Sequence, residues 1–292
     1  MDHQSAAVSK VTVPSMIERK LRGEKIACLT AYDYPTARLV DKAGFDVALV
    51  GDSLGQVVLG YDSTVPVTVE EMLHHVRAVR RGIERTLLVA DLPYGSYHLG
   101  TKETLRAALR FMKQGGAEAV KIEGGKKRAH LIHRLVSEEI PVMGHIGLTP
   151  QSVHLMGGYT VQGRSLDSAS DLMADAQAIE DAGAFALVLE GIPRELASIL
   201  THRLRIPTIG IGAGPDCDGQ VIVFHDLVGL NFQRSAKFVR PYADLHQTLQ
   251  EALAGFRSDV LEGRYPSDQE SYHWSSTLRE QFEKEISPQP RS

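Results

Sequence analysis

Cysteine and long apolar runs are both scarce in this sequence. Its 292 residues include only Cys28 and Cys217. Two cysteines are too few for the disulfide framework of a small secreted protein, and their spacing is not that of metal ligands. No apolar run approaches the roughly 18 residues that a membrane-spanning helix needs, and the first residues do not resemble a secretory signal. We therefore expect a cytoplasmic protein that does not insert into a membrane.

An excess of positive charge is also lacking. The chain carries 32 Lys and Arg residues against 36 Asp and Glu residues, a formal net charge of -4. This balance provides no cationic field for nucleic acid or an anionic membrane, so small-molecule substrates are expected instead. With 43% hydrophobic and 23% charged residues, the chain can bury a large core and differs from disordered proteins in composition.

Eight short apolar runs recur along the chain, each followed by a polar or glycine-bearing corner. Continuous apolar runs are typical of strands that are covered on both faces, as in a parallel sheet. Helical patterns separate them; one begins with Thr68 and Glu71, which form a capping-box motif. The runs are 26–29, 47–50, 87–90, 119–122, 141–143, 186–189, 208–211 and 221–224. This alternation of strand and helix predicts an α/β protein.

The number of runs predicts a closed (β/α)8 barrel, a TIM barrel, which takes about 250 residues. We expect one domain over 1–292, with the barrel at about 24–255. A helix at about 12–22 would close the amino end of the barrel. A C-terminal extension at about 267–292 would form a peripheral helix and a loose tail. The alternative is a doubly wound open sheet, but the glycine-rich stretch 210–216 lies near the seventh run rather than the first.

Four carboxylates follow the predicted strands, where a barrel enzyme places its catalytic groups. Each of them alone is equally consistent with a helix cap. Three acidic groups from adjacent strands repel one another unless a cation lies among them, and oxygen ligands without cysteine favour Mg²⁺. The sequence therefore predicts a magnesium site at Asp52, Asp91 and Glu123.

The fourth carboxylate, Glu190, follows a more distant strand and is predicted to be a general base; a salt bridge across the mouth is its alternative role. Lys121 lies two residues before Glu123, so both side chains share one face of the strand. We expect this ammonium to point inward and bind a carboxylate or oxyanion, although it could also extend outward. His145 is expected to support the site, either by contacting the substrate or by bracing the mouth.

These residues stand in longer ordered segments that resemble one known family. The segments are LTAYDYP at 29–35, VGDSLG at 50–55, GYDST at 60–64, VADLP at 89–93, VKIEGG at 120–125, PVMGHIGLTPQS at 141–152, FALVLE at 185–190 and PTIGIGAGPDCDG at 207–219. From about residue 12 to about residue 266 the chain resembles the ketopantoate hydroxymethyltransferase family. The resemblance implies a barrel of the phosphoenolpyruvate/pyruvate-like type that assembles as a homodecamer, a pentamer of dimers.

The resemblance also implies a reaction and a set of roles. A hydroxymethyl group passes from the co-substrate 5,10-methylenetetrahydrofolate to 3-methyl-2-oxobutanoate through a Mg²⁺-stabilised enolate. The products are 2-dehydropantoate and tetrahydrofolate, in pantothenate biosynthesis. The Mg²⁺ ligands fall on Asp52, Asp91 and Glu123, and the proton acceptor falls on Glu190. The contacts to the oxo acid fall on Asp52, Ser53, Asp91 and Lys121.

Two other functions remain open from the sequence. One is a Mg²⁺-dependent 2-oxo-acid lyase of the isocitrate lyase and phosphonopyruvate-processing superfamily. Such lyases typically carry a catalytic cysteine or a gating loop where this chain has Gly-Gly-Lys-Lys at 124–127. The other is a non-catalytic barrel that acts as a ligand sensor or scaffold, which would need a broken site.

Overall fold

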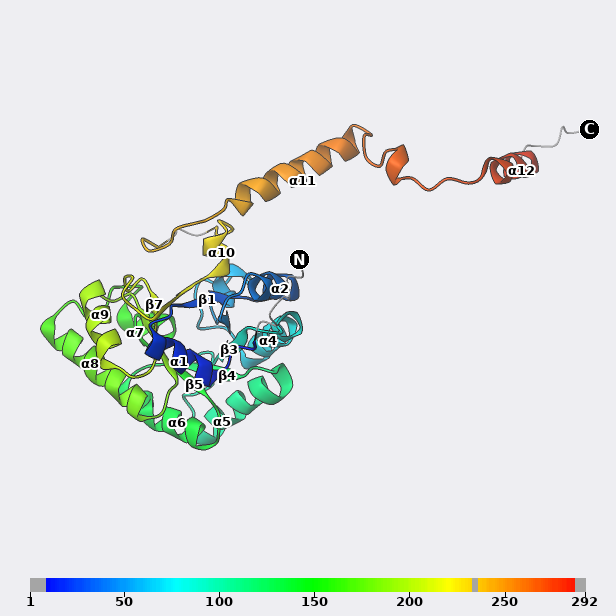
Figure 1. The fold of residues 1–292 in the computed structure, drawn as a ribbon. Helices are drawn as coiled ribbons and strands as arrows, with labels where there is room; N and C mark the ends of the chain where they lie inside the picture. The colour runs from blue at the N-terminus through cyan, green and yellow to red at the C-terminus, as the bar shows by residue number, and fades with distance from the viewer. Residues whose placement is uncertain (1–8, 233–235, 287–292) are drawn as a thin grey trace, which may run out of the picture. The chain divides into compact units, whose positions relative to one another are not determined.

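Eight parallel strands form a closed barrel in the computed structural model, which describes residues 9–232 and 236–286 (Figure 1). The strands follow one another around the barrel in chain order, and β8 pairs with β1 to close it. They are β1 Ile26–Thr30, β2 Val47–Val50, β3 Leu87–Asp91, β4 Ala119–Glu123, β5 Val142–Gly147, β6 Ala186–Glu190, β7 Thr208–Ile211 and β8 Gly219–Ile222. This confirms the predicted (β/α)8 barrel and excludes the open sheet.

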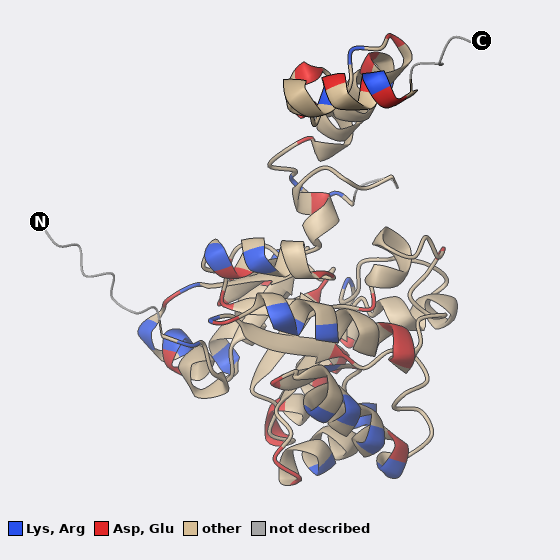
Figure 2. Cartoon of the chain, turned by 90° about the vertical axis from the view of Figure 1, so that its right-hand side faces the viewer, with Lys and Arg blue, Asp and Glu red and all other residues tan. Residues whose placement is uncertain are grey.

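Helices cover the outside of the barrel, and both acidic and basic residues are distributed along them (Figure 2). The predicted capping box opens α4: the Thr68 hydroxyl accepts a hydrogen bond from Glu71 N at 3.2 Å, and the Glu71 carboxylate accepts one from Thr68 N at 2.7 Å. The helices of this part are α1 Val13–Arg22, α2 Tyr34–Lys42, α3 Leu54–Val57, α4 Val69–Gly82, α5 Thr101–Arg110, α6 Lys126–Ser137, α7 Val153–Met156, α8 Leu166–Asp181, α9 Arg194–Arg203 and α10 Phe224–Leu227. A π-helical turn, Phe111–Gly115, continues α5.

The eighth strand begins and ends two residues earlier than its apolar run indicates. Gly219 lies opposite Ile26 of β1, so close that a Cβ atom on it would lie 2.5 Å from the Ile26 carbonyl oxygen. At the other end, Phe224 N donates a hydrogen bond to the Thr30 hydroxyl at 2.8 Å and begins α10. A close approach of backbones therefore sets the register of this strand, which apolar composition does not show.

The interior of the barrel holds its own apolar cluster, separate from the larger cluster between strands and helices. Side chains of successive strands meet there, among them Ile26, Val47 and Leu87. Met16 of α1 belongs to the same cluster and is completely buried. The helix predicted at 12–22 therefore closes the amino end of the barrel, as expected.

Ion pairs fasten the N-terminal segment to the loops at the amino end. Arg19 lies 3.0 Å from Asp46, which precedes β2, and Lys20 lies 2.6 Å from Asp218, which precedes β8. Lys10, just before α1, lies 2.7 Å from Glu118, which precedes β4. Because these contacts reach different parts of the ring of strands, α1 and its lead are held across the end of the barrel.

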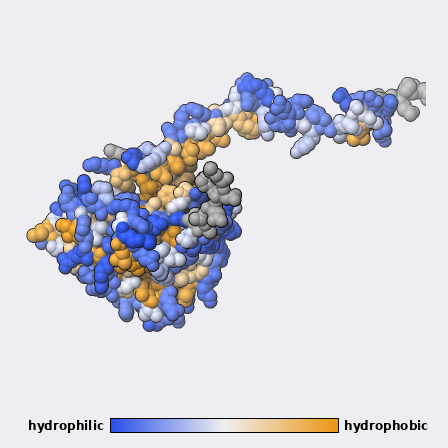
Figure 3. All heavy atoms as spheres, in the orientation of Figure 1, coloured by the Kyte–Doolittle hydropathy of each residue, from blue (hydrophilic) through white to orange (hydrophobic). Residues whose placement is uncertain are grey.

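The chain from Asp244 onward forms a second compact unit. This unit contains α11 Leu245–Leu261 and α12 Ser276–Ile286. Apolar residues are visible along α11 in Figure 3, and no residue of α11 is buried. A helix was expected within 267–292, and α12 lies there. The residues after α12, 287–292, where the loose tail was expected, lie outside the described residues. No helix within the described ranges is long and apolar enough to cross a membrane.

Candidate active site

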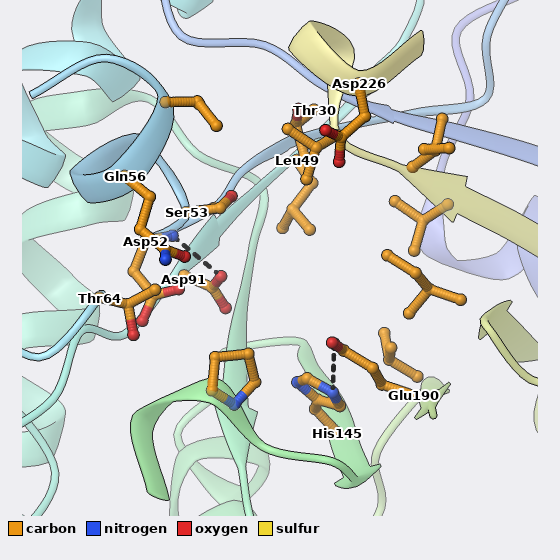
Figure 4. Close-up of a pocket in the computed structure, with 18 of the residues that line it drawn as sticks. Thr30, Leu49, Asp52, Ser53, Gln56, Thr64, Asp91, His145, Glu190 and Asp226 are labelled. Carbon is orange, nitrogen blue, oxygen red and sulfur yellow. Dashed lines mark hydrogen bonds and ion pairs between the residues drawn. The ribbon is translucent and has the colours of Figure 1, made fainter. Parts of the chain in front are cut away.

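A cavity of about 240 Å³ opens at the carboxyl end of the barrel. Every residue that the sequence assigned to a site lines it, namely Asp52, Ser53, Asp91, Lys121, Glu123, His145 and Glu190. Asp52, Ser53 and Asp91 lie on one side of the space, and His145 and Glu190 lie together on another (Figure 4). Strands β2, β3, β4 and β6 thus contribute residues at or just after their carboxyl ends to one polar surface, and β5 contributes His145 from inside the strand.

Three carboxylates of this surface are almost completely buried. Asp91 and Glu123 are the last residues of β3 and β4, and each is 3% exposed; Asp52, after β2, is 4% exposed. Lys121 lies beside Asp91 in the register of the two strands and forms an ion pair with it. The nearby carboxylates raise the pKa of this ammonium despite its burial, so it stays charged. Lys121 therefore points into the barrel, and the outward alternative is excluded.

Ser53 reaches the cavity because the chain turns tightly after β2. A Cβ atom at Gly51 would lie 2.9 Å from the Ser53 hydroxyl and 3.4 Å from Asp91 Oδ2, so glycine lets these groups come close. Ser53 stands at the start of α3 without capping it. Its hydroxyl is instead hydrogen-bonded to the Tyr32 hydroxyl at 2.8 Å. Burial raises the pKa of Tyr32, which keeps this phenol neutral.

Gln151 is a site residue that the strand-end reasoning missed. Its side-chain amide donates hydrogen bonds to Asp52 Oδ2 at 2.8 Å and to the Leu92 carbonyl oxygen at 3.0 Å. Its backbone N–H donates to Glu123 Oε2 at 3.2 Å, and its amide oxygen accepts from the Tyr97 hydroxyl. Gln151 lies in a 3-10 turn beyond β5, so the only signal for it was its place in the segment 141–152.

His145 lies between two carboxylates. It is inside β5, with Nδ1 3.4 Å from Glu123 Oε1 and Nε2 3.2 Å from Glu190 Oε2 (Figure 4). Neither ring nitrogen makes a well-aligned hydrogen bond, so these contacts are ion pairs. Burial and the charge of Lys121 oppose protonation, but the two carboxylates outweigh them and raise the pKa of His145 to about 9. The imidazole is therefore cationic at neutral pH.

Glu190 differs from the other three carboxylates in its exposure. Its side chain is 17% exposed, against 2% to 4% for Glu123 and Asp91. The salt bridge considered as its alternative role does exist, but it joins Glu190 to His145 on the neighbouring strand. This contact orients the carboxylate and leaves part of it facing the cavity.

The charge in the cavity is not balanced by the protein. Burial, and then the charges of Asp91 and Glu123, raise the pKa of Asp52 well above its usual value. On the side formed by β2 to β6, four carboxylates face two cations, Lys121 and His145, so full ionisation there would leave two negative charges uncompensated among the described residues. This excess and the hard oxygen donors fit a divalent cation such as Mg²⁺. Among the described residues, no three Asp, Glu, His or Cys side chains are arranged so that they could hold a metal ion. The carboxylate oxygens of the cavity would therefore exchange contacts to protein donors for contacts to Mg²⁺ when the ion binds.

The opposite wall of the cavity is mainly apolar. It is formed by the ends of β7 and β8 and the segment that follows, with Ile211, Val221, Ile222, Val223 and Phe238 among its residues. Polar residues on this side include Asp226, Asn231 and Thr30. The sequence reasoning assigned nothing to this wall, although Asp226 follows the eighth strand and the strand-end rule could have found it.

Solved structures define the class of barrel to which this fold belongs. Phosphonopyruvate hydrolase, determined as a complex with oxalate and Mg²⁺, matches with a TM-score of 0.55 at 13% identity over 94% of this chain and 96% of that chain. The 2,3-dimethylmalate lyase of the PEP mutase/isocitrate lyase superfamily matches with a TM-score of 0.57 at 18% identity, over 94% and 97%. The chain therefore has the fold of that superfamily, a phosphoenolpyruvate/pyruvate-like barrel.

Sequence relatives narrow this class to one family. A sequence model of the ketopantoate hydroxymethyltransferase family matches residues 10–268. The 3-methyl-2-oxobutanoate hydroxymethyltransferase of Koribacter versatilis (strain Ellin345) is 61% identical over 91% of this chain and 90% of that protein. The enzyme of the same name from Carboxydothermus hydrogenoformans is 53% identical, over 94% and 100%. The chain belongs to the ketopantoate hydroxymethyltransferase family.

Proposed function

We propose that this enzyme transfers a hydroxymethyl group from 5,10-methylenetetrahydrofolate to 3-methyl-2-oxobutanoate. The products are 2-dehydropantoate, an intermediate of pantothenate biosynthesis, and tetrahydrofolate; one water is consumed and supplies the hydroxyl oxygen. Family membership supports the overall reaction. The observation that carries the residue roles is the separation of one partly exposed carboxylate, Glu190, from three buried ones in the same cavity.

The buried carboxylates suit binding of Mg²⁺ and the oxo acid together. Asp52, Asp91 and Glu123 would hold Mg²⁺, which when bound supplies a Lewis acid that polarises the substrate carbonyl. The carboxylate of the oxo acid needs a positive partner, and Lys121 is the ammonium that faces this end of the cavity. Ser53, whose hydroxyl is held by Tyr32, and the neighbouring Asp52 and Asp91 complete the oxo-acid contacts.

Glu190 is the proposed general base. Its carboxylate takes the proton from C3 of the oxo acid, and the electron pair left behind makes an enolate. Water adds to the methylene carbon of the folate as one of its two C–N bonds breaks, and a proton of that water goes to the freed nitrogen. The C3 carbon then forms a bond to the same carbon, which keeps the hydroxyl group, and the second C–N bond breaks. The proton held by Glu190 goes to the second nitrogen. His145, 3.2 Å away, orients Glu190.

The lyase alternative shares the fold but is less well supported by the cavity. Lyases of that superfamily typically carry a catalytic cysteine or a gating loop at the site, and both cysteines of this chain are buried outside the cavity. Cys28 packs in the interior apolar cluster, where burial raises the pKa of its thiol. A sensor or scaffold role is also disfavoured, because all seven proposed site residues face one cavity.

Proton NMR of 3-methyl-2-oxobutanoate in D₂O tests this function. With enzyme and Mg²⁺ alone, the C3 proton signal should disappear by exchange. After methylenetetrahydrofolate is added, a hydroxymethyl signal should appear, and a chelator should suppress both changes. Intact C3 signals without product would contradict the transferase, and cleavage products of a 2-oxo acid would point to the lyase.

A further inference from the structure

The mainly apolar wall of the cavity has no part in the mechanism described above. It lies beside the space that Glu190 faces and includes Phe238, Val223 and Ile211. In Figure 4 the Asp226 carboxylate points into the cavity from the side opposite His145. The cavity therefore has two chemically different sides, one that carries Lys121 and three buried carboxylates, and one that combines apolar surface with a single carboxylate.

The position of Asp226 is fixed by its surroundings. It lies in α10, whose first residue is held by the 2.8 Å hydrogen bond from Phe224 N to the Thr30 hydroxyl. The last residue of α10, Leu227, accepts a hydrogen bond from Tyr242 N at 2.7 Å. The Asn231 side chain donates a hydrogen bond to Asp226 Oδ1 at 2.5 Å. A carboxylate has about four acceptor positions, so this one bond leaves Asp226 able to accept from a ligand.

Phe238 is held against the end of β7 by a glycine. Gly212 has a positive φ of +63°, and a Cβ atom there would lie 2.6 Å from the Phe238 ring. Only glycine allows this contact, so the aromatic ring lies close against the strand. The apolar wall is therefore preformed, as in most small-molecule sites.

The chemistry of this wall fits one of the two proposed substrates and not the other. The oxo acid is an anion, which Asp226 would repel. The pterin ring of a reduced folate is uncharged and flat, and its 2-amino-4-oxopyrimidine edge presents two parallel N–H donors. A carboxylate accepts such a pair in the bidentate manner in which it accepts guanidinium. Apolar side chains and an aromatic ring can cover the faces of the pterin.

We propose that Asp226, oriented by Asn231 and flanked by Phe238, binds the pterin ring of 5,10-methylenetetrahydrofolate. This inference rests on the proposed function and assigns the folate to the side of the cavity opposite Lys121. The opposite charges of the two sides then direct each substrate to its own side. The ammonium attracts the anionic oxo acid, and the Asp226 carboxylate attracts the donor edge of the pterin. The methylene carbon is thereby brought over the space between the two sides, which Glu190 faces.

The test is the Asp226→Asn variant of the full chain. Asparagine keeps the shape of the side chain and an oxygen that can accept from Asn231, but it replaces an acceptor with an NH₂ group that meets the pterin donors. The KM for methylenetetrahydrofolate and the Kd of tetrahydrofolate should each rise by about 10- to 100-fold, the usual effect of losing hydrogen bonds to a charged group. The KM for the oxo acid should change by less than about twofold. Asp167→Asn, an exposed carboxylate at the start of α8, should alter neither KM.

Measuring exchange of the C3 proton in D₂O without folate distinguishes a failure of this inference from a failure of the proposed function. If the wild type shows neither exchange nor product, the proposed function fails. If the wild type is active, two results for Asp226→Asn would overturn the pterin assignment. One is normal binding of tetrahydrofolate, and the other is loss of C3 exchange together with folate affinity. Phe238→Ala provides an independent test should Asp226→Asn not fold. It should also raise the KM for folate more than the KM for the oxo acid, and an equal rise in both would contradict the proposal.

Discussion

The two ends of the barrel both contain buried carboxylates, but they differ in how these charges are compensated. At the amino end, Asp46 has Arg19 at 3.0 Å and Arg85 at 3.4 Å and accepts a hydrogen bond from Ala27 N at 2.9 Å. At the carboxyl end, several carboxylates share Lys121 and His145. The amino end is therefore complete as folded, whereas the carboxyl end retains negative charge for a ligand to neutralise.

The largest effect that would test this difference comes from Glu190→Gln at the carboxyl end. This change removes the proposed base, so kcat should fall by about 10²- to 10⁴-fold, and C3 exchange should slow equally. Mg²⁺ affinity measured by calorimetry should stay nearly normal, because Glu190 is not among the proposed ligands. The exposed Glu195→Gln on α9 is the matched control. Unchanged turnover in Glu190→Gln would remove Glu190 from the base role.

A second prediction concerns pH and the cationic His145. Its pKa is raised from 6.5 to about 9, so the protonated form contributes about 3 kcal/mol of stability. That stability is fully present below about pH 6.5 and is lost as the pH rises through about 9. In Mg²⁺-free protein, the difference in Tm between the wild type and His145→Gln should be largest near pH 6 and vanish near pH 10. The exposed His133→Gln should follow the wild type at every pH, and a difference for His145→Gln that is constant with pH would refute the cationic state.

The third prediction concerns the metal. Asp91→Asn removes a proposed ligand and the ion-pair partner of Lys121. Affinities for Mg²⁺ and for the oxo acid should fall together, each by about 10- to 100-fold, and isothermal titration calorimetry measures both. The exposed Asp171→Asn on α8 is a control that also loses a lysine partner. Normal Mg²⁺ affinity in Asp91→Asn would count against the ligand assignment.

The smallest effect is expected at the amino end. Lys20→Met breaks the ion pair to Asp218 at 2.6 Å and the hydrogen bond to the Thr201 carbonyl oxygen at 2.8 Å. Stability should fall by about 1–2 kcal/mol, visible as a lower Tm at fixed protein concentration, while kcat and both KM values stay unchanged. Arg22→Met, which breaks an exposed ion pair with Glu24, should change Tm far less. Loss of activity in Lys20→Met without loss of stability would mean that the two ends are coupled.

The strands and the acidic side of the site were predictable for the same reason. Strands covered on both faces are continuous apolar runs, and the first charged residue after such a run marks the end of the strand, as at Asp52 and Asp91. The rule failed where a polar residue lies inside a strand. The fifth apolar run, 141–143, ends before His145, whereas β5 continues through it to Gly147, because the His145 side chain points to the interior and pairs with Glu123.

Residues brought to the site by loops were not predictable from strand ends. Gln151 contacts Asp52 across 99 positions of sequence, and no local pattern encodes such a contact. Tyr32 likewise meets Ser53 only because β1 and β2 are neighbours in the barrel. Their positions follow from the way the strands close into a barrel. The pattern of apolar runs in the sequence predicts that a barrel forms but not which loop residues meet.

Closure of the amino end by α1 bears on how substrates reach the site. With Met16 filling the interior beneath the strands, the cavity is reached from the carboxyl end. Under the proposed function, both substrates and both products therefore pass through the same opening. The helix that seals one end of the barrel thereby makes the other end the common route of entry and exit.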